Sequence, residues 1–244
     1  MQDKDNVISF RDGSAAGRRR SGLDRAHRRL IDTCRDDYEK AIRQLLNGLF
    51  EQLDDALYAL SDKTVSSAAR PEYFDSMREL RLMRREIEQR FQNAALSAYS
   101  RFWHLGPEAA ADQAAELKLL EQDELEESLA LEEIASRAEK RFQDPLYLLD
   151  RRFSHMLGGA KVDSGNNPVA PLALAHAFAV GLGSFGRDMR IKLIAYKTFG
   201  QLVERETKPR ARRGGIVARH LARGYLRVDA EANVDVAAGH PRLI

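Results

Sequence analysis

Three arginines, Arg78, Arg81 and Arg85, recur at a spacing that could bind anions. They stand at positions i, i+3 and i+7, so an α-helix would present them on one face. The guanidinium group donates paired hydrogen bonds that fit carboxylates and phosphates alike. Three acids could receive these bonds across a helical hairpin and fix its register: Asp54, Asp55 and Asp62. The alternative is a functional site for an anion or a partner protein.

The other candidate motifs of the sequence, a glycine-rich run, the histidines and the single cysteine, do not predict a cofactor or metal site. The run Gly181–Gly186 matches the dinucleotide fingerprint G-x-G-x-x-G, but that fingerprint needs a preceding strand. We expect a helix there, so we interpret the run as a turn between helices. The six histidines show no i, i+4 pair, and the single cysteine, Cys34, lies on an apolar stripe. The sequence therefore predicts no metal and no cofactor, and it favours a protein without catalytic residues.

The net charge of +2 conceals a segregation of charge. Residues 205–244 hold nine Lys or Arg and four Asp or Glu, which leaves 30 basic and 33 acidic residues elsewhere. The amino terminus lacks the pattern of a secretory signal, and no apolar run approaches the roughly 18 to 20 residues that span a bilayer. We expect a cytoplasmic protein that does not enter the membrane.

The elements that must position the arginines are helices, because apolar residues recur at steps of three and four and no useful β-alternation occurs. The fold class predicted is all-α: a long antiparallel helical hairpin, then a smaller set of helices. The first stripe consists of Leu30, Ile31, Cys34, Tyr38, Ile42, Leu45, Leu49, Leu53, Leu57 and Leu60. The second consists of Phe74, Met77, Leu80, Arg84, Ile87, Phe91, Ala94, Ala95, Ala98, Phe102 and Leu105.

The pattern divides the chain into three parts. Residues 1–21 read as a disordered arm, residues 22–204 as an all-helical domain, and residues 205–244 as an unstructured basic tail. Within the domain, residues 22–105 form the hairpin and residues 106–204 the shorter helices. Leu125, Leu129 and Ile134 mark an apolar face in the acidic stretch 116–139, and an Ala-rich helix is expected from Pro168 to Leu182.

Two runs, Leu49–Lys63 and Tyr73–Arg84, resemble the bacterial domain-of-unknown-function family numbered 1631. Asp123–Ala130 and Asn167–Pro171 resemble further landmarks of that family, and the resemblance covers about residues 22–204, the amino-terminal portion of longer members. Members are sometimes labelled thymidine phosphorylase, but the sequence lacks the Lys-His-Ser-Thr-Gly-Gly type of phosphate-binding run. The family-motif residues, of unknown role, are Asp54, Asp55, Asp62, Tyr73, Phe74, Met77, Arg78, Arg81 and Arg85.

These observations favour a non-catalytic helical interaction or regulatory module with an unidentified protein partner. A nucleic-acid-binding protein is the alternative, through Arg18–Arg20, Arg25, Arg28 and Arg29, although no reading helix or aromatic platform supports it. A binder of a phosphorylated ligand through the Arg78 face is a third reading.

The tail differs in kind from the domain. The apolar period stops after Val203, and a one-base shift over the codons for Lys208 through Arg219 permits Asn-Arg-Ala-Leu-Ala-Glu-Ala-Gly-Leu-Leu-Pro, which resembles the way the family continues. We therefore hypothesise that the tail is translated out of frame, and that its positive charge is not a nucleic-acid site.

Overall fold

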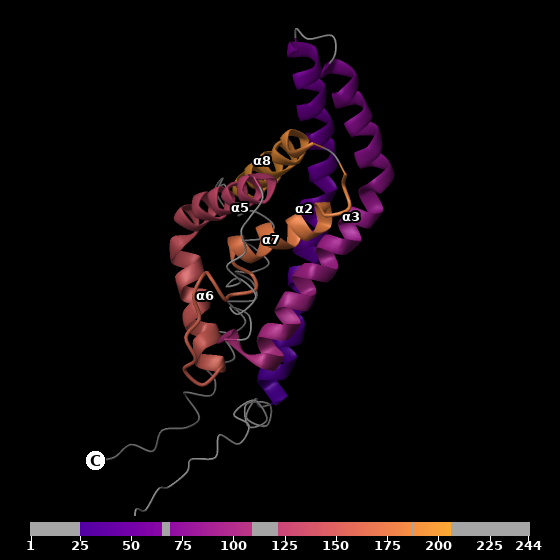
Figure 1. Ribbon diagram of the computed structural model, residues 1–244. Helices are drawn as coiled ribbons and strands as arrows, with labels where there is room; N and C mark the ends of the chain where they lie inside the picture. The colour runs from indigo at the N-terminus through magenta and orange to yellow at the C-terminus, as the bar shows by residue number, and fades with distance from the viewer. Residues whose placement is uncertain (1–24, 65–68, 109–121, 187, 206–244) are drawn as a thin grey trace, which may run out of the picture.

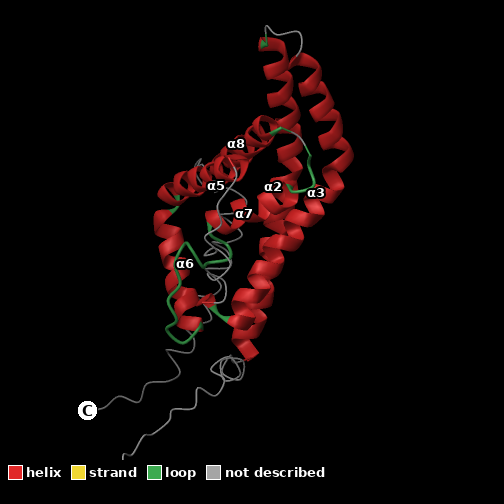
Figure 2. Ribbon diagram, in the orientation of Figure 1, coloured by secondary structure: helices red, strands yellow, loops and turns green. Residues whose placement is uncertain are grey.

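The computed structural model describes residues 25–64, 69–108, 122–186 and 188–205. The predicted arm at 1–21 and residues 206–244 of the predicted tail lie outside this part of the chain. Within it there are helices and no strands (Figure 2), which confirms the all-α prediction. The long helices are α2 (Arg25–Lys63), α3 (Ala69–Leu105), α5 (Gln122–Arg141), α6 (Gln143–Met156), α7 (Pro171–Leu182) and α8 (Met189–Arg205).

Helices α2 and α3 form the predicted antiparallel hairpin (Figure 1). Pro71 lies in the first turn of α3, where its missing N–H has no helical partner to lose. Along α2 the predicted stripe is buried from Leu30 to Leu57, with Ile31 and Cys34 only partly buried. The Tyr99 hydroxyl of α3 donates a hydrogen bond to the Ile31 carbonyl of α2 at 3.1 Å, which joins the two helices at their open end.

The stripe on α3 departs from the prediction at both ends. Phe74 and Leu105 are 46% and 57% exposed, whereas Tyr99 and Trp103, outside the predicted stripe, are buried. Trp103 is buried because α6 brings Phe153 against it, with ring centroids 5.0 Å apart. A periodicity that assumes one partner helix cannot anticipate this second partner.

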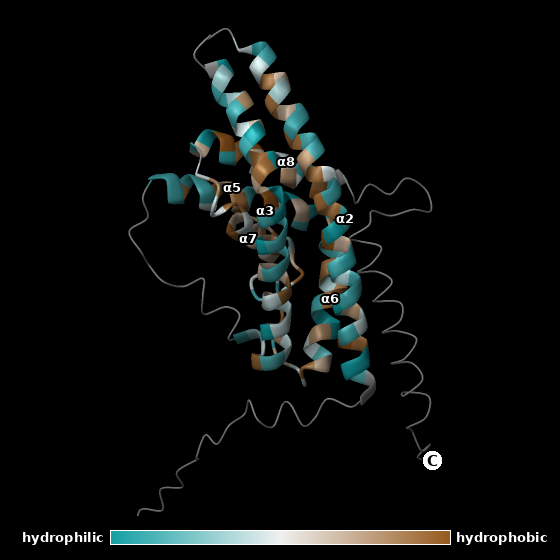
Figure 3. Cartoon of the chain, turned by 90° about the vertical axis from the view of Figure 1, so that its right-hand side faces the viewer, coloured by the Kyte–Doolittle hydropathy of each residue, from teal (hydrophilic) through white to brown (hydrophobic). Residues whose placement is uncertain are grey.

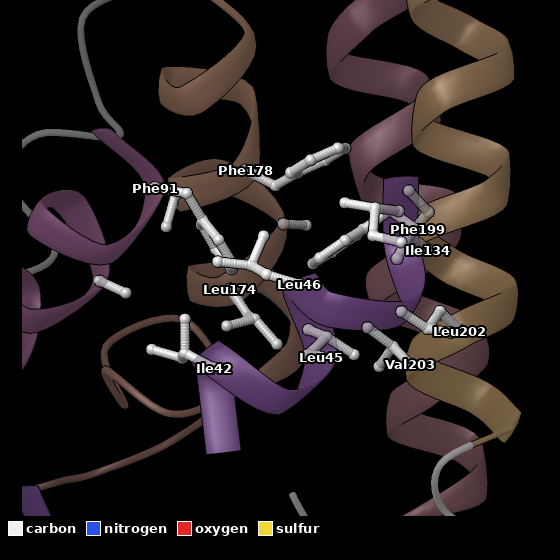
Figure 4. Packing of buried hydrophobic residues seen from close by; sticks show 14 of the residues in the cluster. Ile42, Leu45, Leu46, Phe91, Ile134, Leu174, Phe178, Phe199, Leu202 and Val203 are labelled. Atoms are coloured by element: carbon white, nitrogen blue, oxygen red, sulfur yellow. The ribbon is translucent and has the colours of Figure 1, made fainter. Parts of the chain in front are cut away.

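The waist of the molecule is the level at which α5, α7 and α8 pack against one side of the hairpin. Helix α7 contacts α3, α8 contacts α2, and α5 contacts both α7 and α8. Phe91, Phe178 and Phe199 fill the centre (Figure 4). The rings of Phe178 and Phe199 stack at 4.2 Å, and both meet Phe91 edge-on.

Two glycines allow these helices to approach closely. A Cβ on Gly181 would lie 3.1 Å from the Ile87 carbonyl oxygen of α3, and a Cβ on Gly200 would lie 2.9 Å from Ile134. Gly181 ends a helix and no strand precedes it, so the G-x-G-x-x-G run opens as a packing contact. The prediction of a helix before this run is confirmed.

Two helix predictions need correction. In α5, Leu125 and Leu129 are 49% and 57% exposed, and the buried face is made instead by Leu131, Ile134, Ala135 and Ala138. This face is set by α7 and α8, which contact α5 on the side of its small residues.

Helix α7 begins at Pro171, not Pro168. The Asn167 side chain accepts a hydrogen bond from the Val169 N–H, and Ala170 is extended because it precedes a proline.

A pair of glycines ends α6. Gly158 and Gly159 have φ values of 70° and 89°, a left-handed conformation that ends the helix at little cost. None of the described helices is both long and apolar enough to cross a bilayer.

Candidate interaction face at the closed end of the hairpin

The hairpin extends past α8 at its closed end, where α2 ends and α3 begins (Figures 1 and 3). The waist covers the opposite side, where Gly48 of α2 lies against Leu202 of α8. We call the side that none of the described helices covers the outer face. Its residues are Glu51, Asp54 and Tyr58 of α2 and Phe74, Arg78, Arg81 and Arg85 of α3.

Arg81 and Asp54 join the two helices across this face. The Arg81 Nε donates to the Asp54 Oδ2 at 2.9 Å, with the side chains 63% and 28% exposed. This confirms the predicted cross-hairpin pair for Arg81. Because the pair is exposed, it stabilises the fold by no more than about 1 kcal/mol. Its clearer effect is to fix which residues of α2 and α3 lie at the same height.

Arg84 was not among the predicted site residues, yet it lies beside this face, next to Arg81 and Asp54. Its guanidinium carbon lies 5.0 Å from the centre of the Phe50 ring, and its Nε donates to Glu88 at 2.8 Å. A cation over an aromatic ring is attracted by the ring's negative face. The sequence signal was an arginine within the apolar stripe of α3, which requires an unusual neighbour.

A hollow of about 270 Å³ opens beside these arginines. Leu53, Leu80 and Phe50 supply apolar lining, and charged groups supply the rest: Glu51, Asp54, Arg81 and Arg84. A hollow with this mixed lining suits an apolar side chain that carries or neighbours a charge.

The most unusual feature is an exposed aromatic pair. Tyr58 of α2 and Phe74 of α3 meet edge-to-face with ring centroids 6.5 Å apart, and they remain 59% and 46% exposed. Phe74 shares one helical stripe with Arg78, Arg81 and Arg85, at steps of four, three and four. Phe74 was already among the family-motif residues, and that spacing is the signal that could have removed it from the predicted apolar stripe.

The remaining predicted residues divide into two groups. Met77 is buried and Tyr73 is partly buried against the core, so both serve packing. Arg78, Arg85, Asp55 and Asp62 are exposed and make no ion pair within the described part of the chain. Of the three arginines considered for pairing across the hairpin, Arg81 alone makes such a pair among the described residues.

The outer face and the hollow beside it bring guanidinium groups, carboxylates and aromatic rings together. Among the described residues of the whole chain, no group of three or more His, Cys, Asp or Glu side chains is placed to hold a metal.

A second polar cluster lies between α6 and the loop that leads into α7. The Asn167 amide donates to the Asp150 Oδ1 at 2.7 Å. Burial raises the pKa of the Asp150 carboxyl above its ordinary value, and the hydrogen bond from Asn167 partly offsets this. Burial likewise raises the pKa of Glu139. Asn167 is itself 1% exposed and also caps the turn before α7, so we assign this cluster a structural role.

The fold and this face define a class: an all-helical domain built on a long hairpin with one uncovered, charged and aromatic side. Residues 26–212 match the family described as protein of unknown function (DUF1631), N-terminal domain, and the chain belongs to this family. The match contains both sequence runs that form the closed end of the hairpin. No curated protein and no solved structure matches the chain.

Proposed function

We propose that this chain is a non-catalytic helical module that binds a protein partner through the outer face. The observation that carries the proposal is the exposed pair Tyr58 and Phe74, on the same face as Arg78 and Arg85, which make no ion pair within the described part of the chain. Aromatic residues and arginine dominate binding energy at protein interfaces, because they bury large areas while retaining polar contacts.

The hollow strengthens the case for a protein partner over a phosphorylated ligand. The carboxylates of Glu51 and Asp54 line it together with Arg81 and Arg84. A phosphate placed there would meet two like charges, whereas an apolar side chain would cover Leu53 and Leu80 and leave the charged rim in water. The mixed lining therefore favours a peptide surface.

The nucleic-acid alternative gains little from the fold. Arg18–Arg20 lie outside the described residues, and Arg28 and Arg29 are followed on α2 by Asp32, Asp36 and Asp37. Alternating signs along one helix dilute the positive potential that phosphate backbones require. The cytoplasmic location also remains a prediction.

The proposal is tested by removing the aromatic pair. A Tyr58→Ala/Phe74→Ala variant and the wild type would each be used to capture partners from cells that normally contain the protein, with quantitative mass spectrometry of cross-linked products. Tyr147→Ala is the matched control, since Tyr147 is 61% exposed on α6, away from the outer face. We expect the double variant to lose its partner, another copy of the chain included, and the control to retain it. An identical set of products from all three proteins would refute the proposal.

A further inference from the structure

The outer face consists of two stripes that lie side by side, one on each helix of the hairpin. The stripe on α2 contains Glu51, Asp54 and Tyr58. The stripe on α3 contains Phe74, Arg78, Arg81 and Arg85. The two stripes touch where Tyr58 meets Phe74 and where Arg81 donates its hydrogen bond to Asp54. A molecule that lies along the hairpin on this side therefore contacts both stripes at once.

The face offers apolar surface at two levels along the hairpin. The first level is the exposed aromatic pair, Tyr58 and Phe74. The second is the hollow, whose apolar lining is Phe50, Leu53 and Leu80. From the aromatic pair to the middle of the hollow is about seven residues along either helix, which is roughly 10 Å at the helical rise. A partner must therefore supply two apolar side chains about 10 Å apart.

The charges of the face call for acids on the partner. Two residues of the α3 stripe, Arg78 and Arg85, make no ion pair in the described part of the chain, whereas on the α2 stripe only Glu51 is in that state. The exposed Asp75 follows Phe74 directly, so it is turned by about 100° from that side chain around the helix. Arg78 and Arg85 are themselves seven residues apart, again roughly 10 Å. Complementary charge on a partner consists of two acids with this spacing, opposite the α3 stripe.

We propose that the partner presents an acidic amphipathic helix, which lies along the hairpin over both stripes and forms a three-helix bundle with α2 and α3. This proposal rests on the outer face being a protein-binding surface. Two apolar side chains seven residues apart on the partner helix are separated by about 10 Å, so one covers the aromatic pair and the other enters the hollow. Two acids with the same spacing, on the edge that faces α3, pair with Arg78 and Arg85.

A helix fits this spacing and an extended segment does not. Seven residues make about two turns of a helix, so side chains seven apart stay on one face. An extended segment covers 10 Å in about three residues, and side chains three apart on a strand point to opposite sides. The hairpin already accepts helices on its other side, where α7 packs against α3 and α8 packs against α2. The described residues form no strand, so they offer no sheet edge to an extended peptide.

The complex should be weak. From Phe74 to Arg85 the face is about 16 Å long, which a partner helix of about twelve residues covers. An interface of this size lies below the range of stable complexes, so we expect a dissociation constant in the micromolar range. Because Arg78 and Arg85 are exposed, binding should weaken at high salt.

A phage-displayed library of random peptides provides the test, because it favours no chemistry in advance. The peptides are about 16 residues long, enough for about four helical turns. The baits are the full chain, its charge-reversed variant Arg78→Glu/Arg85→Glu, and a control, Lys140→Glu/Lys197→Glu. The control makes the same change in net charge at exposed positions of α5 and α8.

We expect the wild type and the control to enrich acidic peptides in which apolar residues recur at helical steps and include a pair seven apart. The charge-reversed variant should lose these peptides and enrich Lys and Arg instead. Fluorescence polarisation of one enriched, synthesised peptide should show affinity at least about tenfold weaker for the charge-reversed variant and within about threefold of the wild type for the control. Circular dichroism melts show that each bait is folded, and Arg78→Gln/Arg85→Gln, with a smaller expected loss, replaces the reversed variant if that one is not.

Three outcomes would overturn the proposal: a selection that enriches nothing, enriched peptides without the helical period or the acids, or the same peptides on the charge-reversed variant. If one of these occurs while the Tyr58→Ala/Phe74→Ala variant still loses a captured protein, the binding face stands and the acidic helix is refuted as its occupant. If capture does not depend on the aromatic pair either, both proposals fail.

Discussion

The waist and the closed end use the same hairpin in opposite ways. At the waist, Phe91 of α3 is 0% exposed because Phe178 and Phe199 close over it. At the closed end, Phe74 of the same helix is 46% exposed, and its ring contact is Tyr58, itself exposed. The residue type and the helix are the same. Only the presence of a covering layer differs.

The difference separates stability from recognition. Three layers of helix meet at the waist, so a side chain there touches neighbours on all sides and its loss leaves a cavity. The closed end has one buried layer, with Leu53, Leu57 and Leu80 between α2 and α3. Substitutions on its outer face should change binding with little effect on folding, while substitutions at the waist should do the reverse.

The largest effect is expected at the waist. Phe199→Ala removes a ring that is 0% exposed and stacked on Phe178, so the free energy of unfolding should fall by about 3 to 5 kcal/mol. Phe74→Ala, the same substitution on the outer face, should cost under about 1 kcal/mol. Urea denaturation of both variants measures the contrast, and equal losses would break the distinction between the two regions.

The next effect tests the polar cluster between α6 and the loop before α7. Asn167→Ala removes the donor to Asp150 and the acceptor for the Val169 N–H, and should cost about 1 to 3 kcal/mol. Burial raises the pKa of Asp150 in the folded protein above its ordinary value in the unfolded chain. In the wild type, the stability that this carboxyl group contributes is therefore lost as pH rises from the ordinary pKa through the raised one. Without the hydrogen bond from the Asn167 amide, burying the charged Asp150 carboxylate costs more free energy. The loss should therefore be larger at about pH 7 than at about pH 4.

Denaturation at both pH values checks this, with Asp150→Ala as the second arm of a double-mutant cycle. In the Asp150→Ala background the extra loss near neutral pH should disappear. A loss that is the same at both pH values in the wild-type background would assign Asn167 to the turn alone.

A smaller effect sharpens the description of the closed end. Arg81→Ala should cost under about 1 kcal/mol, since its pair with Asp54 is exposed, and Arg78→Ala should fall within about 0.5 kcal/mol of the wild type. Thermal and urea unfolding measure both. The purely structural reading of these arginines requires roughly 1 to 3 kcal/mol for Arg78→Ala, and such a value would reveal a partner in the folded chain.

The sequence was sufficient for the elements and the hairpin. Buried positions on α2 follow the three-and-four period because one partner, α3, sets one stripe. The prediction failed where a second partner arrives, as at Trp103 beneath α6, or where none does, as at Phe74. Period alone reports which residues share a face and not what covers that face.

The candidate site was half predictable for the same reason. The spacing of Arg78, Arg81 and Arg85 placed them on one stripe, but only Arg81 points toward an acid of α2. Which member of a stripe reaches the neighbouring helix depends on the height and rotation of that helix. The height and rotation of the neighbouring helix are set by packing along the whole hairpin. The short run that contains the arginines contributes little to that packing.

The smallest effect is expected from residues 213–244, which follow the family match and lie outside the described residues. The buried residues of the waist all come from upstream of Arg205. Under the frameshift hypothesis, the tail was never selected to pack against them. A chain of residues 1–212 should therefore unfold within about 0.5 kcal/mol of the full chain in parallel urea titrations. A chain of residues 1–198, which also loses Phe199 and Leu202, should be severely destabilised and serves as the control. A fall of more than about 1 kcal/mol in the free energy of unfolding for residues 1–212 would show that the tail packs. An intact reading frame through Ile244, shared by several close relatives, would refute the frameshift hypothesis.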